Sequence, residues 1–190
     1  MNKRALINKS AYAALALLDS DGEPGLTMRT LAARLGVTPM SLYHHVSDRA
    51  GLLRALSDRV YGAVLQGVDA PGSDLPGSDI DRIRTLLTRY YDAVVAHPQL
   101  TFAIFAEPAA FAGASRDLAD RLTGLLAALT PAHLLWRDIL VDHVHGGGLA
   151  LIAARGDAVR VKMLRDTYRQ TLDYLLVQIS EAQKSFQPPC

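Results

Sequence analysis

The side chains best suited to chemistry lie close together, between residues 38 and 46. Thr38-Pro39 opens a short stretch in which Leu42 and Val46 fall on one helical face. The side chains left for the outer surface are Met40, Ser41, Tyr43, His44 and His45. A serine hydroxyl can hydrogen-bond a base edge, a methyl-bearing group can contact thymine, and tyrosine or histidine can hydrogen-bond a phosphate. Such a surface is unusual on a solvated helix and is suited to a helix that lies in a DNA groove.

The residues before this stretch predict another short helix and a tight turn. Thr27 can cap a helix that carries Leu31 and Leu35 at i, i+4 spacing, and Gly36 suits a left-handed turn after it. The Thr38-Pro39 pair then provides the cap and first position of the next helix. This order is typical of a helix-turn-helix. A generic helical hairpin inside an all-helical core is the alternative.

The charge of the chain supports a nucleic-acid contact only near its beginning. The whole sequence has 20 Lys and Arg against 19 Asp and Glu. Residues 1–66 carry eight basic and five acidic residues, so the remainder is slightly acidic. Thr27 and Arg29 begin the supporting helix, where free backbone N–H groups favour a phosphate, and Arg29 can alternatively reach guanine. We therefore expect any polyanion to bind the first part of the chain.

Residues 15–56 resemble the DNA-binding domain of the TetR family of bacterial transcriptional repressors. The resemblance is carried by the run Thr-Met-Arg-Thr-Leu-Ala-Ala-Arg-Leu-Gly-Val-Thr-Pro-Met-Ser-Leu-Tyr-His-His-Val at 27–46. Its Leu-Tyr-X-His-Val part is closest to the tetracycline-repressor branch. His44 stands where that branch often has tryptophan, and Met40-Ser41 replaces Pro-Thr. These differences concern the operator sequence rather than the binding mode.

The resemblance implies a set of DNA contacts and a way of binding. The implied contacts are Thr27, Arg29, Thr38, Pro39, Met40, Ser41, Tyr43, His44, His45 and Arg49. It also implies a homodimer on a palindromic double-stranded operator, because two such helices must enter successive major grooves about 34 Å apart. The function implied is that of a ligand-responsive regulator, in particular a repressor, released by a small-molecule effector of unknown identity.

The remaining sequence predicts further helices and no strand, so the expected fold class is all-α. We expect a helix-turn-helix DNA-binding domain at 1–66, a loop or linker at 67–79 and a helical effector-binding and dimerisation domain at 80–190. A helix should span 80–94 and end at His97-Pro98, followed by a less regular aromatic stretch broken at Pro108. Ser115 and Thr130-Pro131 should each begin a helix, and a last one should follow residue 157.

The second domain should hold the effector and pair the two subunits. Helices near 131–154 and 158–183 should form a four-helix bundle with a second copy, as the resemblance implies. The residues that could line an effector cavity are Tyr90, Phe102, Phe105, Trp136, Arg137, His143 and His145. Ordinary core packing is the alternative role for each. Gly146-Gly147-Gly148 should either break its helix or allow a close approach of a neighbouring backbone.

Several other classes of protein are disfavoured by the sequence. Cys190 is the only cysteine, which excludes a disulfide framework and a cysteine-based zinc site. His143 and His145 do not share a helical face, so we expect no metal. Motifs of phosphate-binding loops, serine hydrolases and zinc proteases are missing, and we expect no catalytic residue and no cofactor. A helical enzyme or a protein-binding adaptor is the alternative. With no signal peptide or membrane span expected, the chain should be cytoplasmic.

Overall fold

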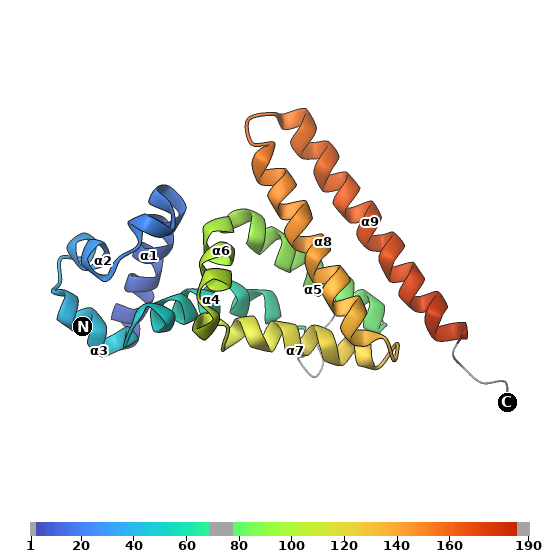
Figure 1. Cartoon of the computed structure of the whole chain (residues 1–190), viewed down its shortest axis with the longest axis horizontal. Coiled ribbons are helices and arrows are strands. Elements are labelled where there is room, and N and C mark those ends of the chain that lie inside the picture. The colour runs from blue at the N-terminus through green and yellow to red at the C-terminus, as the bar shows by residue number, and fades with distance from the viewer. Residues whose placement is uncertain (1–2, 69–77, 186–190) are drawn as a thin grey trace. The chain divides into compact units, whose positions relative to one another are not determined.

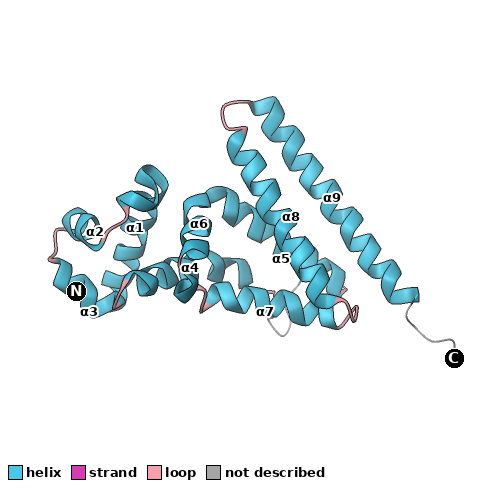
Figure 2. Cartoon of the chain, viewed as in Figure 1, coloured by secondary structure: helices cyan, strands magenta, loops and turns pink. Residues whose placement is uncertain are grey.

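The computed structural model describes residues 3–68 and 78–185, and all regular elements within them are helical (Figure 2). The elements are α1 (Lys3–Gly25), α2 (Met28–Leu35), α3 (Pro39–Val46), α4 (Arg49–Leu65), α5 (Asp79–Ala96), α6 (Pro98–Ala106), the 3-10 helix η1 (Pro108–Ala110), α7 (Ala114–Ala127), α8 (His133–Ala153) and α9 (Ala158–Ser185) (Figure 1). The predicted all-α class is confirmed. Most of the expected linker, residues 69–77, and Cys190 lie outside the described residues.

The backbone forms two compact units that do not follow the order of the chain. One combines residues 1–63 with 97–117, and the other combines 64–96 with 118–190. The first unit therefore contains the helix-turn-helix region together with α6 and η1, and the second contains α5, α8 and α9. The predicted division of roles at 67–79 stays a prediction.

The local signals of the helix-turn-helix are found where the sequence placed them. The Thr27 side chain accepts a hydrogen bond from the Thr30 amide at 3.0 Å, and the Thr30 hydroxyl oxygen accepts one from the Thr27 amide at 3.0 Å. Gly36 ends α2 in the left-handed region, with φ 67°. Thr38 caps α3, whose first residue is Pro39. Each signal acts within three residues of its partner, which explains why sequence alone locates the turn.

The first unit is completed by α6, which packs against α1. His97 Nδ1 lies 3.0 Å from Asp19 Oδ2, and the Tyr61 hydroxyl lies 3.0 Å from Thr101 Oγ1. Both members of the Tyr61–Thr101 pair are buried. Burial raises the pKa of Tyr61 to about 12, so the phenol stays neutral in this core. These contacts attach a segment from the middle of the chain to the N-terminal helices.

Three expected details of the later helices are wrong. Residues 98–106 form a regular helix rather than an irregular stretch, because Pro98 occupies the first helical position, where its missing N–H costs nothing. Ser115 does not cap α7: the helix begins at Ala114, whose amide donates to Asp58 Oδ1 at 2.9 Å. Thr130-Pro131 does not begin α8 either: the helix begins at His133, after a short turn.

The three consecutive glycines do not break α8, and two of them permit close packing. The helix runs continuously from His133 to Ala153. A Cβ on Gly147 would lie 3.0 Å from Tyr168 Cδ2, and one on Gly148 would lie 2.8 Å from Val94 Cγ1. Gly146 has nothing within 4 Å of that position. The second and third glycines therefore let α5 and α9 approach α8.

Candidate nucleic-acid interface

The outer face of α3 carries the polar and aromatic side chains that the sequence pattern predicts. Leu42 and Val46 are buried and fix the opposite face to the domain core. Met40 is 65% exposed and Tyr43 is 44% exposed. His44 is exposed as well, whereas the His45 side chain lies outside the described residues. An exposed methionine and tyrosine on one short helix are costly to hydrate and are available to a partner.

The first turn of α3 holds two hydroxyl groups in a fixed geometry. The oxygens of Thr38 and Ser41 lie 3.0 Å apart, and the Ser41 amide donates to Thr38 Oγ1 at 3.3 Å. Thr38 and Pro39 are exposed, and Ser41 is half-buried. The pair can present a hydroxyl donor and acceptor at the helix N-terminus, where recognition helices contact base edges.

The start of α2 presents a second polar group of side chains. Thr27 and Arg29 are exposed. Thr30, which the sequence did not single out, fixes this end by donating from its hydroxyl to the Gly25 carbonyl at 2.7 Å. The Thr-x-x-Thr spacing was the signal available, since it resembles a capping box with threonine in place of the usual glutamate.

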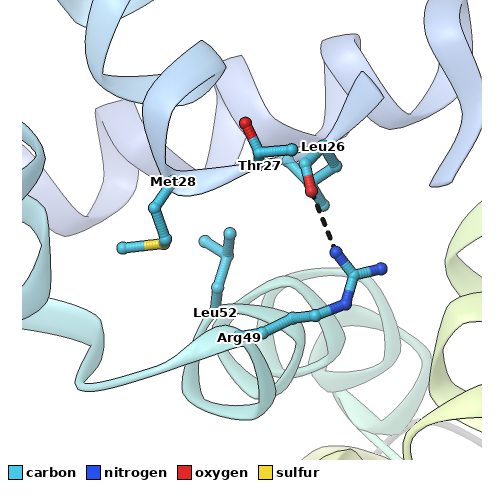
Figure 3. Close-up of a pocket in the computed structure, with 5 residues that line it drawn as sticks. All are labelled: Leu26, Thr27, Met28, Arg49 and Leu52. Atoms are coloured by element: carbon cyan, nitrogen blue, oxygen red, sulfur yellow. Dashed lines mark hydrogen bonds between the residues drawn. The ribbon is translucent and has the colours of Figure 1, made fainter. Parts of the chain in front are cut away.

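Arg49 differs from the other predicted contacts because it is directed at the protein backbone. Its Nη1 donates to the Leu26 carbonyl at 2.9 Å (Figure 3). The bond borders a pocket of about 210 Å³ lined by Leu26, Thr27, Met28, Arg49 and Leu52. In this view the first three come from the start of α2 and the residues before it, and the last two come from α4 (Figure 3). Arg49 thus connects the beginning of α2 to the beginning of α4.

Two of the predicted effector residues form a pair within the second unit. The Tyr90 hydroxyl lies 2.7 Å from His145 Nε2, with the rings edge-to-face. Burial lowers the pKa of His145, and the charge of Asp142 opposes this effect in part. A neutral imidazole bonded to a phenol is therefore the stable arrangement here at neutral pH.

His143 points to different neighbours from His145. Its ring stacks on Tyr168, which stacks in turn on Tyr91. Burial raises the pKa of both tyrosines. His143 Nε2 also lies 3.2 Å from the Tyr168 carbonyl oxygen. Within the described parts of the chain no group of three His, Cys, Asp or Glu residues is placed to hold a metal ion.

The other predicted effector residues are dispersed. Trp136 is half-buried, and Arg137 forms an ion pair with the neighbouring Asp138 at 2.8 Å. Phe102 and Phe105 belong to the first unit and are exposed. Of this set, the structure brings Tyr90 and His145 into contact. His143 lies two residues before His145 on α8 and faces Tyr168 instead. An effector cavity built from all seven residues stays a prediction.

The helix-turn-helix part of the chain matches a known family model. Residues 12–56 match the profile of "Bacterial regulatory proteins, tetR family". The chain is 42% identical over 57 residues to the tetracycline repressor protein class D of Escherichia coli, a stretch of 30% of this chain and 24% of that protein. The similarity to the tetR family of bacterial regulatory proteins therefore covers the helix-turn-helix part of the chain.

Two solved structures share the fold over nearly the whole chain. TetR of Acinetobacter baumannii in complex with minocycline has a TM-score of 0.70 at 20% identity, covering 93% of this chain and 97% of that one. BioQ with its double-stranded DNA operator has a TM-score of 0.64 at 22% identity, covering 95% and 98%. At this identity the likeness concerns the fold alone.

The family match and the predicted sites overlap only in part. All ten predicted DNA contacts lie within the matched residues 12–56, and all seven predicted effector residues lie outside them. The chain spans about a fifth to a quarter of the length of the curated relatives that it matches. No described helix is long and apolar enough to cross a membrane.

Proposed function

We propose that this protein is a transcriptional regulator that binds double-stranded DNA through α3, acts as a repressor and is released by a small-molecule effector. The observation that carries the proposal is the exposed polar and aromatic face of α3, with Met40 and Tyr43 at its surface. The two caps and the glycine turn support it, because they fix this face without help from a partner. The proposed contacts are Thr27, Arg29, Thr38, Pro39, Met40, Ser41, Tyr43, His44 and His45.

The proposed form on DNA is a homodimer paired through α8 and α9. Large apolar side chains on α9 remain exposed along one face: Val159, Met163, Tyr174 and Val177. On α8 the corresponding exposed residues are Leu134, Leu135, Ile139 and Leu149. α8 and α9 pack against each other, so the two sets belong to one helix pair. A second copy of the same pair would bury them in a four-helix bundle.

Selection of duplexes from a random pool tests the DNA-binding part of the proposal. The purified protein should enrich an inverted repeat, since a symmetric dimer presents α3 twice. Failure to enrich any duplex at low ionic strength would contradict DNA binding, and enrichment of a single unrepeated site would contradict the symmetric dimer.

The effector part can be tested on the complex with the selected duplex. An effector releases the protein only if it binds the DNA-incompetent state more tightly. Minocycline, the ligand in the similarly folded Acinetobacter structure, is the first probe of a panel of aromatic antibiotics. Release by one of them, abolished when both Tyr90 and His145 are replaced, would support the proposed cavity. A complex that persists with every compound would contradict it.

A further inference from the structure

The bond from Arg49 to Leu26 joins the two ends of the helix-turn-helix. Leu26 is buried and stands directly before Thr27, the N-cap of α2. Arg49 begins α4, three residues after α3 ends at Val46. The hydrogen bond of 2.9 Å therefore spans 23 residues and closes a loop that contains α2, the turn and α3.

The other carbonyl groups around this point are held by α2 itself. The Gly25 carbonyl accepts from the Thr30 hydroxyl at 2.7 Å, and the Thr27 carbonyl accepts from the Leu31 amide at 3.0 Å. The Leu26 carbonyl between them is bound by a guanidinium from α4 instead. This contact consequently fixes where α2 begins relative to α4.

The start of α4 is itself fixed to the end of α3. The turn between them is two residues long, with Ser47 at φ 53°, and the Gly51 amide donates to Asp48 Oδ1 at 2.6 Å. The backbone at Arg49 is therefore placed by α3, while its side chain holds the residue before α2. Both helices of the motif are constrained by one side chain.

We propose that Arg49 is a positioning residue, which sets the orientation of α2 and α3 and contributes to DNA affinity through this geometry rather than through a phosphate contact. The inference rests on the proposed function. It differs from what the family resemblance implies for this position, which is a direct contact. Preorganisation lowers the entropy lost on binding, whereas a phosphate contact releases counterions. The two roles therefore differ in salt dependence.

Affinity measured over a series of KCl concentrations separates these roles. The probe is the duplex selected by the wild-type protein. Arg49→Ala should bind at least about tenfold more weakly, with the slope of log affinity against log salt unchanged. Arg29→Ala, which removes an exposed guanidinium, should reduce the slope by about 0.9 per subunit. Arg34→Ala is the matched control, since it removes the same charge from the exposed end of α2 and should change affinity less than about twofold.

Arg49→Gln keeps a side-chain N–H donor and removes the charge. We expect this variant to bind more tightly than Arg49→Ala, with the wild-type slope. A slope reduced in both Arg49 variants as much as in Arg29→Ala would overturn the proposal.

Hydrogen exchange provides a readout that does not depend on DNA. The amides of Thr30 and Leu31 should exchange faster in Arg49→Ala than in wild type, and less so in Arg49→Gln. Equal exchange in all three proteins would also overturn the proposal. If the wild-type protein binds no duplex, the proposed function fails, while the exchange comparison still decides whether Arg49 holds α2. If Arg49→Ala does not fold, the salt slope and the hydrogen exchange of Arg49→Gln are compared with those of the wild type.

Discussion

The half-buried imidazole of His145 makes the stability of the second unit depend on pH. Burial lowers the pKa of His145 below its ordinary value of 6.5, so the folded protein binds a proton there more weakly than the unfolded chain does. The associated stability is fully present above about pH 6.5 and is lost as the pH falls toward the folded value. We expect the free energy of unfolding to decrease below that pH, and to decrease less in His145→Gln.

Urea unfolding of the wild type and His145→Gln at a series of pH values checks this prediction. Tyr90→Phe is the control, because it removes the hydroxyl partner and leaves the ring that buries the imidazole. Its pH dependence should match that of the wild type even if the protein is less stable. Identical pH profiles for wild type and His145→Gln would show that His145 does not titrate in this way.

Tyr43 tests the outer face of α3 at the level of one side chain. Its ring is 44% exposed, so removing it should leave the fold and the oligomeric state intact. Tyr43→Ala should weaken binding to the selected duplex about tenfold or more, which corresponds to about 1.4 kcal/mol. Fluorescence anisotropy gives the affinity. Tyr43→Phe separates the two possible causes, because it loses only the hydroxyl; an affinity of Tyr43→Ala equal to wild type would remove Tyr43 from the interface.

At the scale of elements, the glycines of α8 provide a matched set in one helix. Gly146→Ala meets nothing within 4 Å and should stabilise the protein by about 1 kcal/mol through helix propensity. Gly148→Ala places its Cβ 2.8 Å from Val94 Cγ1 and should destabilise it by about 1–3 kcal/mol. Denaturant midpoints of the two variants should therefore move in opposite directions. A gain in both would mean that α5 does not approach α8 as closely as described.

A second element-scale test concerns the start of α7. Asp58 accepts the Ala114 amide at 2.9 Å, so Asp58→Ala should destabilise the protein by about 1 kcal/mol. Asp58→Asn keeps an acceptor oxygen and should recover most of that loss in the same thermal or urea unfolding experiment. An equal loss of unfolding free energy in both variants would indicate that α7 requires the negative charge of Asp58 rather than its hydrogen bond.

The helix starts show which features sequence can and cannot predict. The side chains of Thr27 and Thr38 each accept a hydrogen bond from an amide three residues later. Each cap can therefore be predicted from the local sequence. Ala114 is capped by Asp58, 56 residues away, and no local pattern indicates that contact. Ser115 was the nearest local candidate, but its hydroxyl donates back to the Ala112 carbonyl.

The same distinction separates the two candidate sites. The face proposed to contact DNA lies on one helix with its caps, and its residue types single it out without tertiary information. The candidate effector region depends on pairs such as Tyr90 and His145, which are 55 residues apart. Their aromatic and polar side chains made seven residues candidates for an effector cavity. Two of them, Phe102 and Phe105, lie in the first compact unit rather than the second. Composition alone does not predict which of these residues come together in the folded chain.

At the scale of the whole molecule, the proposed dimer requires the exposed apolar face of α9. Residues 159, 163, 174 and 177 recur at intervals that keep them on one side of a 3.6-residue helix. A monomer would leave this stripe in water along most of a helix that runs from Ala158 to Ser185. Burial against a second copy removes that cost, because apolar area taken out of water contributes about 25 cal/mol per Å².

Two exposed methionines allow the proposed dimer and the proposed DNA contact to be tested with the same type of substitution, methionine to aspartate. Met163, 57% exposed on α9, and Met40, 65% exposed on α3, can each be replaced by aspartate with little effect on the fold. Met163→Asp should raise the dimer dissociation constant at least about tenfold, because an unpaired carboxylate would have to be buried. Met40→Asp should keep the wild-type dimer and lose duplex binding through repulsion from phosphate. Sedimentation equilibrium and anisotropy on both variants give the comparison. A Met163→Asp protein that remains as dimeric as Met40→Asp would place the subunit contact away from this face of α9.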